Sequence, residues 1–199
     1  MSLFEEHKAE RRERILIAAR KLVGEGGYDG LTMRDLARAA RVSVPTLYNL
    51  FGSKDQLVEA YLDARTDATR DQVERTLTRF RTPRERLLGV FDAQGQVFTQ
   101  PDFNGCAHLT ASAEAEAGSP VEYANNRYRQ WVRTLFTDLA REAGVADSED
   151  LARQLQLLYD GAGVSARMDR DPSAATTARA AAAALFDAAT KTERAADAP

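Results

Sequence analysis

Few side chains in this sequence could make or break covalent bonds. Its 199 residues include one cysteine, Cys106, and two histidines, His7 and His108. Cys106, His108 and Glu114 lie close together in sequence, whereas the members of a catalytic triad usually come from distant segments. One cysteine and two histidines also fall short of a zinc site. We therefore expect no catalytic residues, no metal, no cofactor and no enzyme activity.

The lone thiol leaves one alternative open. A single cysteine cannot form an internal disulfide, and no basic residue adjoins Cys106 to stabilise a thiolate. A buried, unreactive thiol is the favoured interpretation, and a redox switch at Cys106 is the minority one.

Composition points to a water-soluble protein with two unequal halves. No apolar run approaches the roughly 18 residues of a membrane span, and the first residues are charged, so we expect a cytoplasmic protein. The net charge is −3. Residues 1–55 nevertheless hold ten Lys and Arg against eight Asp and Glu, so the acidic excess lies in the remainder. This asymmetry gives weak support for nucleic-acid binding by the first part.

Apolar residues recur at helical spacing along the chain, and no segment alternates with period two, so the sequence predicts an all-α fold. Thr32 and Ser43 are N-cap candidates, and Ser53 begins a Ser-x-x-Gln pattern typical of a capping box. Nine helices are predicted, over residues 6–25, 33–40, 44–51, 54–80, 83–99, 106–117, 120–143, 148–168 and 172–189.

The segment 31–54 predicts a helix-turn-helix. Two helices of about eight residues are joined by Arg41-Val42-Ser43. Such an arrangement leaves the outer face of the second helix free for a DNA major groove, which is about 12 Å wide and admits one helix. The apolar residues expected between the helices are Leu36, Ala37, Ala40, Val42, Leu47 and Leu50.

This segment resembles the amino-terminal signature of the TetR family. The resemblance implies a helix-turn-helix DNA-binding domain at 1–52 and a ligand-binding and dimerisation domain at 53–191, and the small, polar residues 192–199 predict a flexible tail. It also implies a ligand-released repressor that binds a palindromic operator as a dimer. The matching residues are Ile15, Leu16, Ala18, Ala19, Leu22, Tyr28, 31–37, Ala40, Val42, Ser43, Thr46, Leu47, Tyr48, Phe51, Ser53, Lys54 and Leu57.

The resemblance assigns DNA-binding roles to particular residues. Thr32, Tyr48 and Lys54 would hold phosphates, which fixes the register without reading sequence. An amide such as that of Asn49 can form two hydrogen bonds with adenine. Thr32 and Ser43 can serve as helix caps as well. The candidates for base contact are Ser43, Val44, Pro45, Thr46 and Asn49.

Arg41 departs from the family pattern, which commonly has glycine in this turn. A non-glycine residue loses about 1 kcal/mol if its φ is positive. Either the turn differs slightly here, or Arg41 compensates by contacting a DNA phosphate.

The family resemblance gives the carboxy-terminal region the role of binding an unidentified small-molecule inducer. Aromatic side chains at helical spacing can instead be ordinary core. We also expect Tyr123 to help surround an apolar pocket in this region. The expected ligand-binding residues are Phe91, Gln94, Phe98, Phe103, Cys106, His108, Asn125, Tyr128 and Trp131.

Small and apolar side chains on the last two predicted helices indicate a homodimer interface, because small residues allow two helices to approach closely. Alanine-rich helices can alternatively be good helix formers at a surface. The expected interface residues are Leu151, Leu155, Leu158, Ala162, Ser165, Ala181 and Leu185.

Two alternatives to a repressor remain at this level. One is an activator or a ligand-independent architectural DNA-binding protein. The other is a helical enzyme that reuses a helix-turn-helix core, which would turn over a small molecule without DNA.

Overall fold

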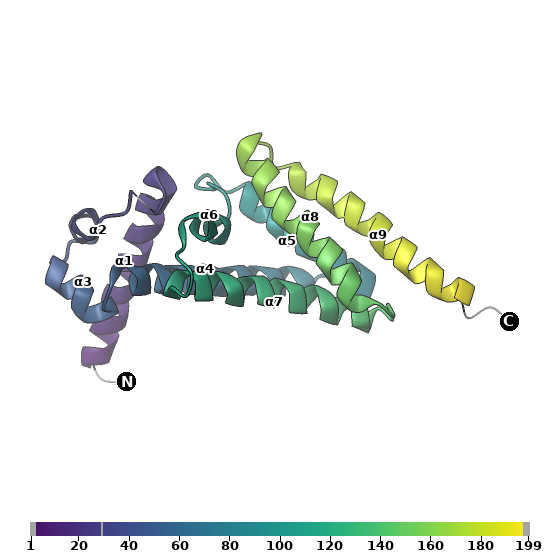
Figure 1. Cartoon of the computed structure of the whole chain (residues 1–199), viewed down its shortest axis with the longest axis horizontal. Coiled ribbons are helices and arrows are strands. Elements are labelled where there is room, and N and C mark those ends of the chain that lie inside the picture. Colours follow the sequence, from purple (N-terminus) through teal and green to yellow (C-terminus); the bar gives the residue numbers. More distant parts are fainter. Residues whose placement is uncertain (1–2, 29, 197–199) are drawn as a thin grey trace. The chain divides into compact units, whose positions relative to one another are not determined.

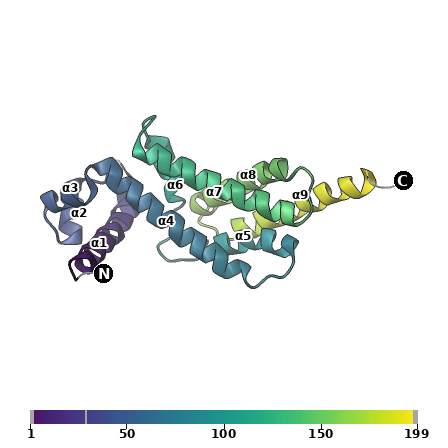
Figure 2. The same ribbon diagram turned by 90° about the horizontal axis from the view of Figure 1, so that it is seen from below.

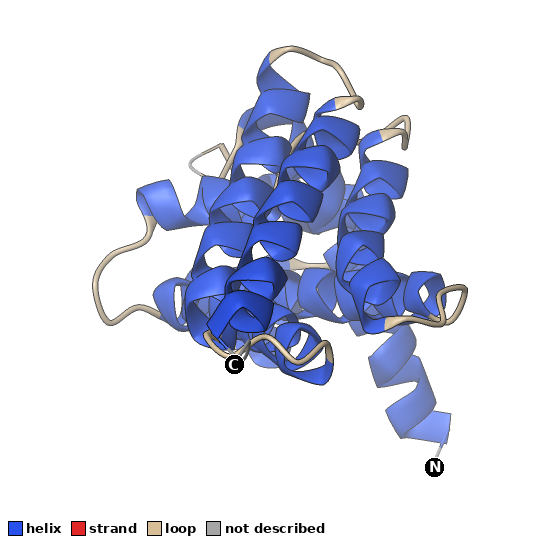
Figure 3. Ribbon diagram, turned by 90° about the vertical axis from the view of Figure 1, so that its right-hand side faces the viewer, coloured by secondary structure: helices blue, strands red, loops and turns tan. Residues whose placement is uncertain are grey.

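The computed structural model describes residues 3–28 and 30–196, with side chains for all of these except residues 3, 4, 114 and 191–196. This part of the chain forms nine α-helices and no strand (Figure 3), which confirms the predicted all-α class. None of the described helices has the length and apolar character that a membrane crossing requires. The helices are α1 (Leu3–Gly26), α2 (Met33–Ala40), α3 (Val44–Phe51), α4 (Lys54–Leu77), α5 (Pro83–Phe98), α6 (Ala107–Glu114), α7 (Pro120–Glu142), α8 (Ser148–Met168) and α9 (Ala174–Ala196).

The helices belong to two compact units. The first contains residues up to 67 together with 107–127, and the second contains 68–106 together with the chain from 128 onward. Helices α4 and α7 each contribute to both units (Figures 1 and 2). The functional division at residues 52 and 53 remains a prediction, because compactness does not test which residues bind DNA or ligand.

The first unit is built around α1, which packs against α2. Ile15 and Ala19 on α1 are fully buried together with Leu36 of α2 and Leu47 of α3. Burial of each such leucine stabilises the fold by about 2 kcal/mol relative to exposure. Ala111, from α6, joins the same core. The predicted packing of the helix-turn-helix is therefore present.

Two arginines of α1 bind the carboxy-terminal ends of the next two helices. Arg14 Nε donates to the carbonyl of Ala40, the last residue of α2, at 3.2 Å. Arg12 donates to the carbonyl of Leu50 at 3.4 Å, and its guanidinium lies over the Phe51 ring. Cations at helix carboxy-termini interact favourably with the helix dipole. The basic residues of α1 thus help to position the helix-turn-helix.

The core of the second unit centres on three aromatic rings. Phe91 of α5 lies 5.6 Å from Phe136 of α7 and 6.2 Å from Tyr159 of α8, measured between ring centroids. Helix α9 packs against α5 and α8. A bidentate pair from Arg84 to Asp187, at 2.8 and 2.9 Å, joins α5 to α9. These contacts hold α9 to the rest of the unit.

Several helix boundaries differ from the predicted ones, most clearly those of α4 and α9. Helix α4 ends at Leu77 instead of Phe80, because the N–H groups of Arg79 and Phe80 bond to carbonyls only three residues back. Helix α9 begins at Ala174 instead of Pro172, since Asp171 accepts the Ser173 N–H in a turn. It continues to Ala196, into the segment expected as a tail, of which 197–199 lie outside the described residues.

Candidate functional site

The predicted caps define the two helices of the helix-turn-helix. The Thr32 hydroxyl accepts the N–H of Asp35 at 3.0 Å and donates to the Asp35 carboxylate at 2.6 Å. Ser43 Oγ accepts the N–H of Thr46 at 3.3 Å. Each cap satisfies one of the free N–H groups of a helix start. The connection between α2 and α3 is therefore restricted to residues 41–43, as the sequence predicts.

Arg41 occupies the position that ends α2 in a left-handed turn, with φ 55° and ψ 47°. Its N–H bonds to the Arg38 carbonyl, and the N–H of Val42 bonds to the Ala37 carbonyl at 2.9 Å. This pairing is the usual way of satisfying the last carbonyls of a helix, and it favours glycine. The side chain of Arg41 is exposed. The turn therefore keeps its left-handed geometry at some cost in backbone energy.

We expect Arg41→Gly to raise the free energy of unfolding by about 0.5–1 kcal/mol, because glycine adopts a positive φ without the clash of a Cβ. Urea unfolding followed by circular dichroism measures the change. Arg34→Gly is the matched control, since Arg34 lies in the first turn of α2 with ordinary helical geometry, where glycine should not stabilise the protein. A loss of stability in Arg41→Gly would contradict the left-handed conformation of residue 41.

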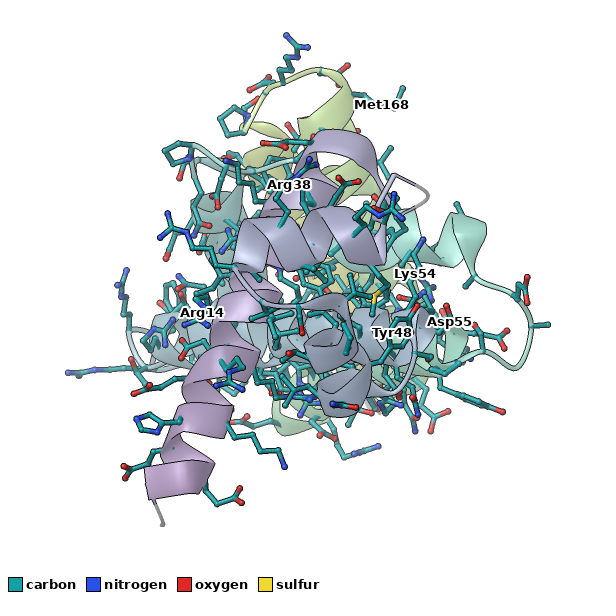
Figure 4. All side chains as sticks on the ribbon, turned by 90° about the vertical axis from the view of Figure 1, so that its left-hand side faces the viewer. Arg14, Arg38, Tyr48, Lys54, Asp55 and Met168 are labelled. Carbon is teal, nitrogen blue, oxygen red and sulfur yellow. The ribbon has the colours of Figure 1, made fainter. Side chains whose placement is uncertain are left out.

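The outer face of α3 presents the side chains best suited to contact DNA. Tyr48 is 48% exposed, and Pro45 and Asn49 are exposed as well. No described residue forms a hydrogen bond with the Tyr48 hydroxyl or the Asn49 amide, so both are free to bind another molecule. In Figure 4, Tyr48 on α3 and Lys54 at the start of α4 lie on the same side of the view.

The other residues predicted for base contact are less open. The hydroxyls of Ser43 and Thr46 lie 2.8 Å apart and bond to each other. Val44 is half-buried and packs against the core of the first unit. The outward orientation predicted for Val44 is therefore only partly correct, because its side chain completes the contact between α3 and that core.

The predicted phosphate ligands differ in availability. Lys54 Nζ donates to the carbonyl of Tyr28 at 3.1 Å, which leaves two of its three protons for an anion. The Thr32 hydroxyl is engaged by Asp35, as described above. Arg34, which the sequence analysis did not single out, is exposed on the first turn of α2 and has no partner among the described residues. Its position beside the cap is the signal that could have identified it.

Comparison with known proteins shows which family this chain resembles. The model of bacterial regulatory proteins of the tetR family matches residues 15–61. The HTH-type transcriptional repressor KstR of Mycolicibacterium smegmatis is 37% identical over 82 residues, 41% of this chain and 40% of its own. The HTH-type transcriptional regulator BetI of Agrobacterium fabrum is 30% identical over 153 residues, 76% of this chain and 74% of its own.

Similarity to a solved structure extends along nearly the whole chain. A TetR transcriptional regulator from Streptomyces avermitilis is 34% identical, with 90% of this chain and 98% of that one covered and a TM-score of 0.78. The chain belongs to the TetR family. TetR-family proteins are DNA-binding transcriptional regulators, so the helix-turn-helix of this chain is the DNA-binding head of such a regulator.

In this TetR-family chain the aromatic residues predicted to line a ligand pocket form separate contacts. Phe98 lies 4.9 Å from Phe103 and Tyr128 lies 5.8 Å from Trp131, between ring centroids. Phe91 belongs to the three-ring core described above. Tyr123, which was expected to help surround an apolar pocket, is 56% exposed in the structure. Cys106 is half-buried against the core of the second unit.

Two of the predicted ligand residues, His108 and Asn125, belong to the first unit of this TetR-family chain and bind each other. His108 Nδ1 lies 3.1 Å from Asn125 Oδ1, and His108 Nε2 lies 3.0 Å from the Thr66 hydroxyl. Burial lowers the pKa of His108 to about 4, and the hydrogen bond with Asn125 opposes the shift only in part. His108 is therefore neutral at physiological pH.

Three of the residues predicted for the dimer interface are buried within the chain itself. Leu151, Leu155 and Ala162 lie on the face of α8 that packs into the core of the second unit. Their expected exposure is wrong, because that core covers this face. Leu158 and Leu185 are half-buried, whereas Ser165 and Ala181 are exposed as expected.

Proposed function

We propose that this TetR-family regulator is a dimeric repressor that binds a twofold-symmetric operator and leaves it when a small molecule binds. The observation that carries the proposal is the exposed face of α3, where the Tyr48 hydroxyl and the Asn49 amide have no partner among the described residues. The KstR relative is itself a transcriptional repressor, which supports repression over activation.

Each exposed polar group of the head has a separate role in the proposal. Asn49 reads a base edge from the middle of α3, where a bidentate amide contact would discriminate adenine. Tyr48, Arg41 and Lys54 bind phosphates. Thr32 caps α2, and the free N–H groups at this helix start can bind a further phosphate. Pro45, Thr46, Ser43 and the edge of Val44 provide the remaining contacts with base edges and thymine methyl groups.

The proposed dimer uses a stripe of α8 that the chain itself leaves uncovered. Leu157 is 71% exposed and Met168 is 76% exposed, with exposed Gly161 and half-buried Val164 at helical spacing between them. On α9, Ala181 lies with exposed Ala184 and Ala188 at the same spacing. Since α8 and α9 pack side by side (Figure 1), the two stripes can form one apolar surface for a second copy.

The proposed inducer site uses the predicted residues of the second unit, around Gln94. The Gln94 amide donates to the Tyr159 carbonyl at 2.8 Å, but its Oε1 is buried and has no hydrogen-bond donor among the described residues. Leaving a buried acceptor unpaired costs about 1–3 kcal/mol, so a ligand that donates there would recover this energy. His108 of α6 and Asn125 of α7 lie in the first unit and are not part of this proposed site.

The proposed transmission to DNA uses contacts inside the first unit. The Tyr28 hydroxyl donates to the carbonyl of Ala107 at 3.0 Å and thereby joins the loop after α1 to the start of α6. Lys54 at the start of α4 bonds to Tyr28 in turn. A ligand that moves α6 or α4 would therefore move α3. If the ligand binds the DNA-free conformation more tightly than the DNA-bound one by about 1–3 kcal/mol, the affinity of the protein for DNA falls by the same free energy.

Selection from random DNA duplexes at about 150 mM salt tests the proposal, because purely electrostatic binding is weak under these conditions. Sequencing of the selected pool should recover two half-sites related by twofold symmetry. Recovery of a single half-site would contradict the proposal that the protein binds DNA as a dimer. Enrichment of no sequence would contradict the proposal that it recognises a specific operator.

We expect Tyr48→Phe to lower operator affinity by roughly 150-fold. A hydrogen bond to a charged phosphate contributes about 1.5 kcal/mol, and a dimer loses two of them. Fluorescence anisotropy with the selected duplex measures the change. Tyr123→Phe is the matched control, since that tyrosine is equally exposed but lies on α7. Equal affinities for the two variants would remove Tyr48 from the interface.

A further inference from the structure

A groove of about 480 Å³ in the second unit lies apart from Gln94 and has only Trp131 in common with the proposed inducer residues. Its apolar wall is formed by Leu77 of α4, Phe80 and two residues of α7, Trp131 and Leu135. The rest of the lining consists of Val73, Thr78 and four charged side chains, Arg70, Glu74, Arg81 and Arg86. The groove therefore combines a flat aromatic surface with cationic groups.

Arg70 is the unusual residue of this groove. Its guanidinium lies over the ring of Trp131, 5.3 Å from the ring centroid. The Nε atom is buried, and no described residue accepts a hydrogen bond from it or forms an ion pair with this side chain. A partly buried guanidinium usually has a carboxylate or carbonyl partner. In the described part of the chain, this guanidinium is instead held against the face of the Trp131 ring.

The remaining charges of the groove leave a net positive site. Arg86 is neutralised by Glu142, whose two oxygens lie 2.6 and 2.7 Å from the guanidinium. Arg81 is exposed and has no partner among the described residues, and Glu74 supplies the opposing carboxylate of the lining. An anion entering the groove would thus meet two available guanidinium groups and one repelling carboxylate.

We propose that this groove binds an amphipathic carboxylate. The apolar body of the ligand packs against Trp131, Phe80 and Leu135, and its carboxylate accepts hydrogen bonds from Arg70 and Arg81. A guanidinium and a carboxylate match in shape and can form two parallel hydrogen bonds. The groove shares only Trp131 with the proposed inducer residues, so this is a second ligand site of the regulatory domain.

Titration of the full-length protein with decanoate, without DNA, tests the proposal. Trp131 is the single tryptophan of the chain, so its fluorescence reports binding next to its ring, and the Arg70 variant described below assigns that binding to the groove. 1-Decanol is the uncharged comparison, because it has the same apolar body without the carboxylate. We expect a saturable fluorescence change with decanoate and at least tenfold weaker binding of decanol. Equal affinity for the two would overturn the assignment of the arginines.

Three variants separate the charged groups. Arg70→Gln should weaken decanoate binding about tenfold, and Glu74→Gln should strengthen it severalfold, because the two changes alter the charge at the groove in opposite directions. Arg75→Gln is the matched control, since Arg75 lies on the same helix outside the groove and bonds to Gln72. Equal effects of Arg70→Gln and Arg75→Gln would overturn the proposal.

Two further checks keep the result interpretable. Thermal unfolding by circular dichroism should show that Arg70→Gln remains folded, and Arg70→Lys should restore part of the affinity because it keeps the charge without the planar fork. Loss of binding without loss of folding supports the site. Because no DNA is present, failure of this experiment leaves the operator proposal untouched, and failure of duplex selection leaves this site untouched.

Discussion

Replacement of Phe91 by alanine is expected to lower the free energy of unfolding by about 3–5 kcal/mol. The Phe91 side chain is 0% exposed, and its ring contacts Phe136 and Tyr159. Removal of the ring forfeits both its burial and its aromatic contacts, and it leaves a cavity that the surrounding helices can fill only in part. An effect of this size identifies Phe91 as core of the second unit.

Urea unfolding measured by far-ultraviolet circular dichroism gives the value for Phe91→Ala. The matched control is Tyr123→Ala, since that aromatic residue is 56% exposed and its removal should cost about 0.5 kcal/mol or less. A small effect for Phe91→Ala would mean that the ring borders open space. That result would support Phe91 as a residue of the inducer site and would contradict its role in the core.

Acidification is expected to destabilise the protein through His108. Burial lowers the pKa of His108 from 6.5 to about 4 in the folded chain. Between these two values the unfolded state binds a proton that the folded state does not, so stability falls as the pH falls. The contribution is complete above pH 6.5 and is lost progressively down to about pH 4. Its full size is about 3 kcal/mol, at 1.36 kcal/mol per pKa unit.

The free energy of unfolding, measured at several pH values from 7.5 to 4, tests this expectation. His108→Gln should give a shallower dependence on pH, because glutamine cannot titrate. His7→Gln is the control, since His7 is the other histidine of the chain and lies exposed on α1. If His7→Gln flattens the curve and His108→Gln does not, burial of a neutral His108 is excluded as the cause.

The sequence alone determined the features that depend on neighbouring residues. Thr32 and Ser43 were predicted as caps and are caps in the structure, because a capping hydroxyl needs only the N–H groups two or three residues ahead of it. The turn at Arg41 was located in the same way, from the spacing between two short helices. Helix α8 was predicted with both of its ends correct. Membership of the TetR family likewise follows from a continuous local motif.

Contacts between distant segments could not be read from the sequence. His108 is a visible candidate for chemistry, but its burial beside distant residues such as Thr66, 42 residues away, lowers its pKa and keeps it neutral. Arg70 of α4 contacts Trp131 of α7, and no local sequence pattern predicts this contact.

Helix α8 shows most clearly that burial could not be read from the sequence. Leu155 and Leu157 are leucines of equal hydrophobicity two positions apart, and they point to different sides of the helix. The sequence determined that α8 forms and that it has apolar residues on more than one side. Only the packing of α9 and α5 decided that Leu155 is core and Leu157 is surface, because burial depends on which neighbours cover a face.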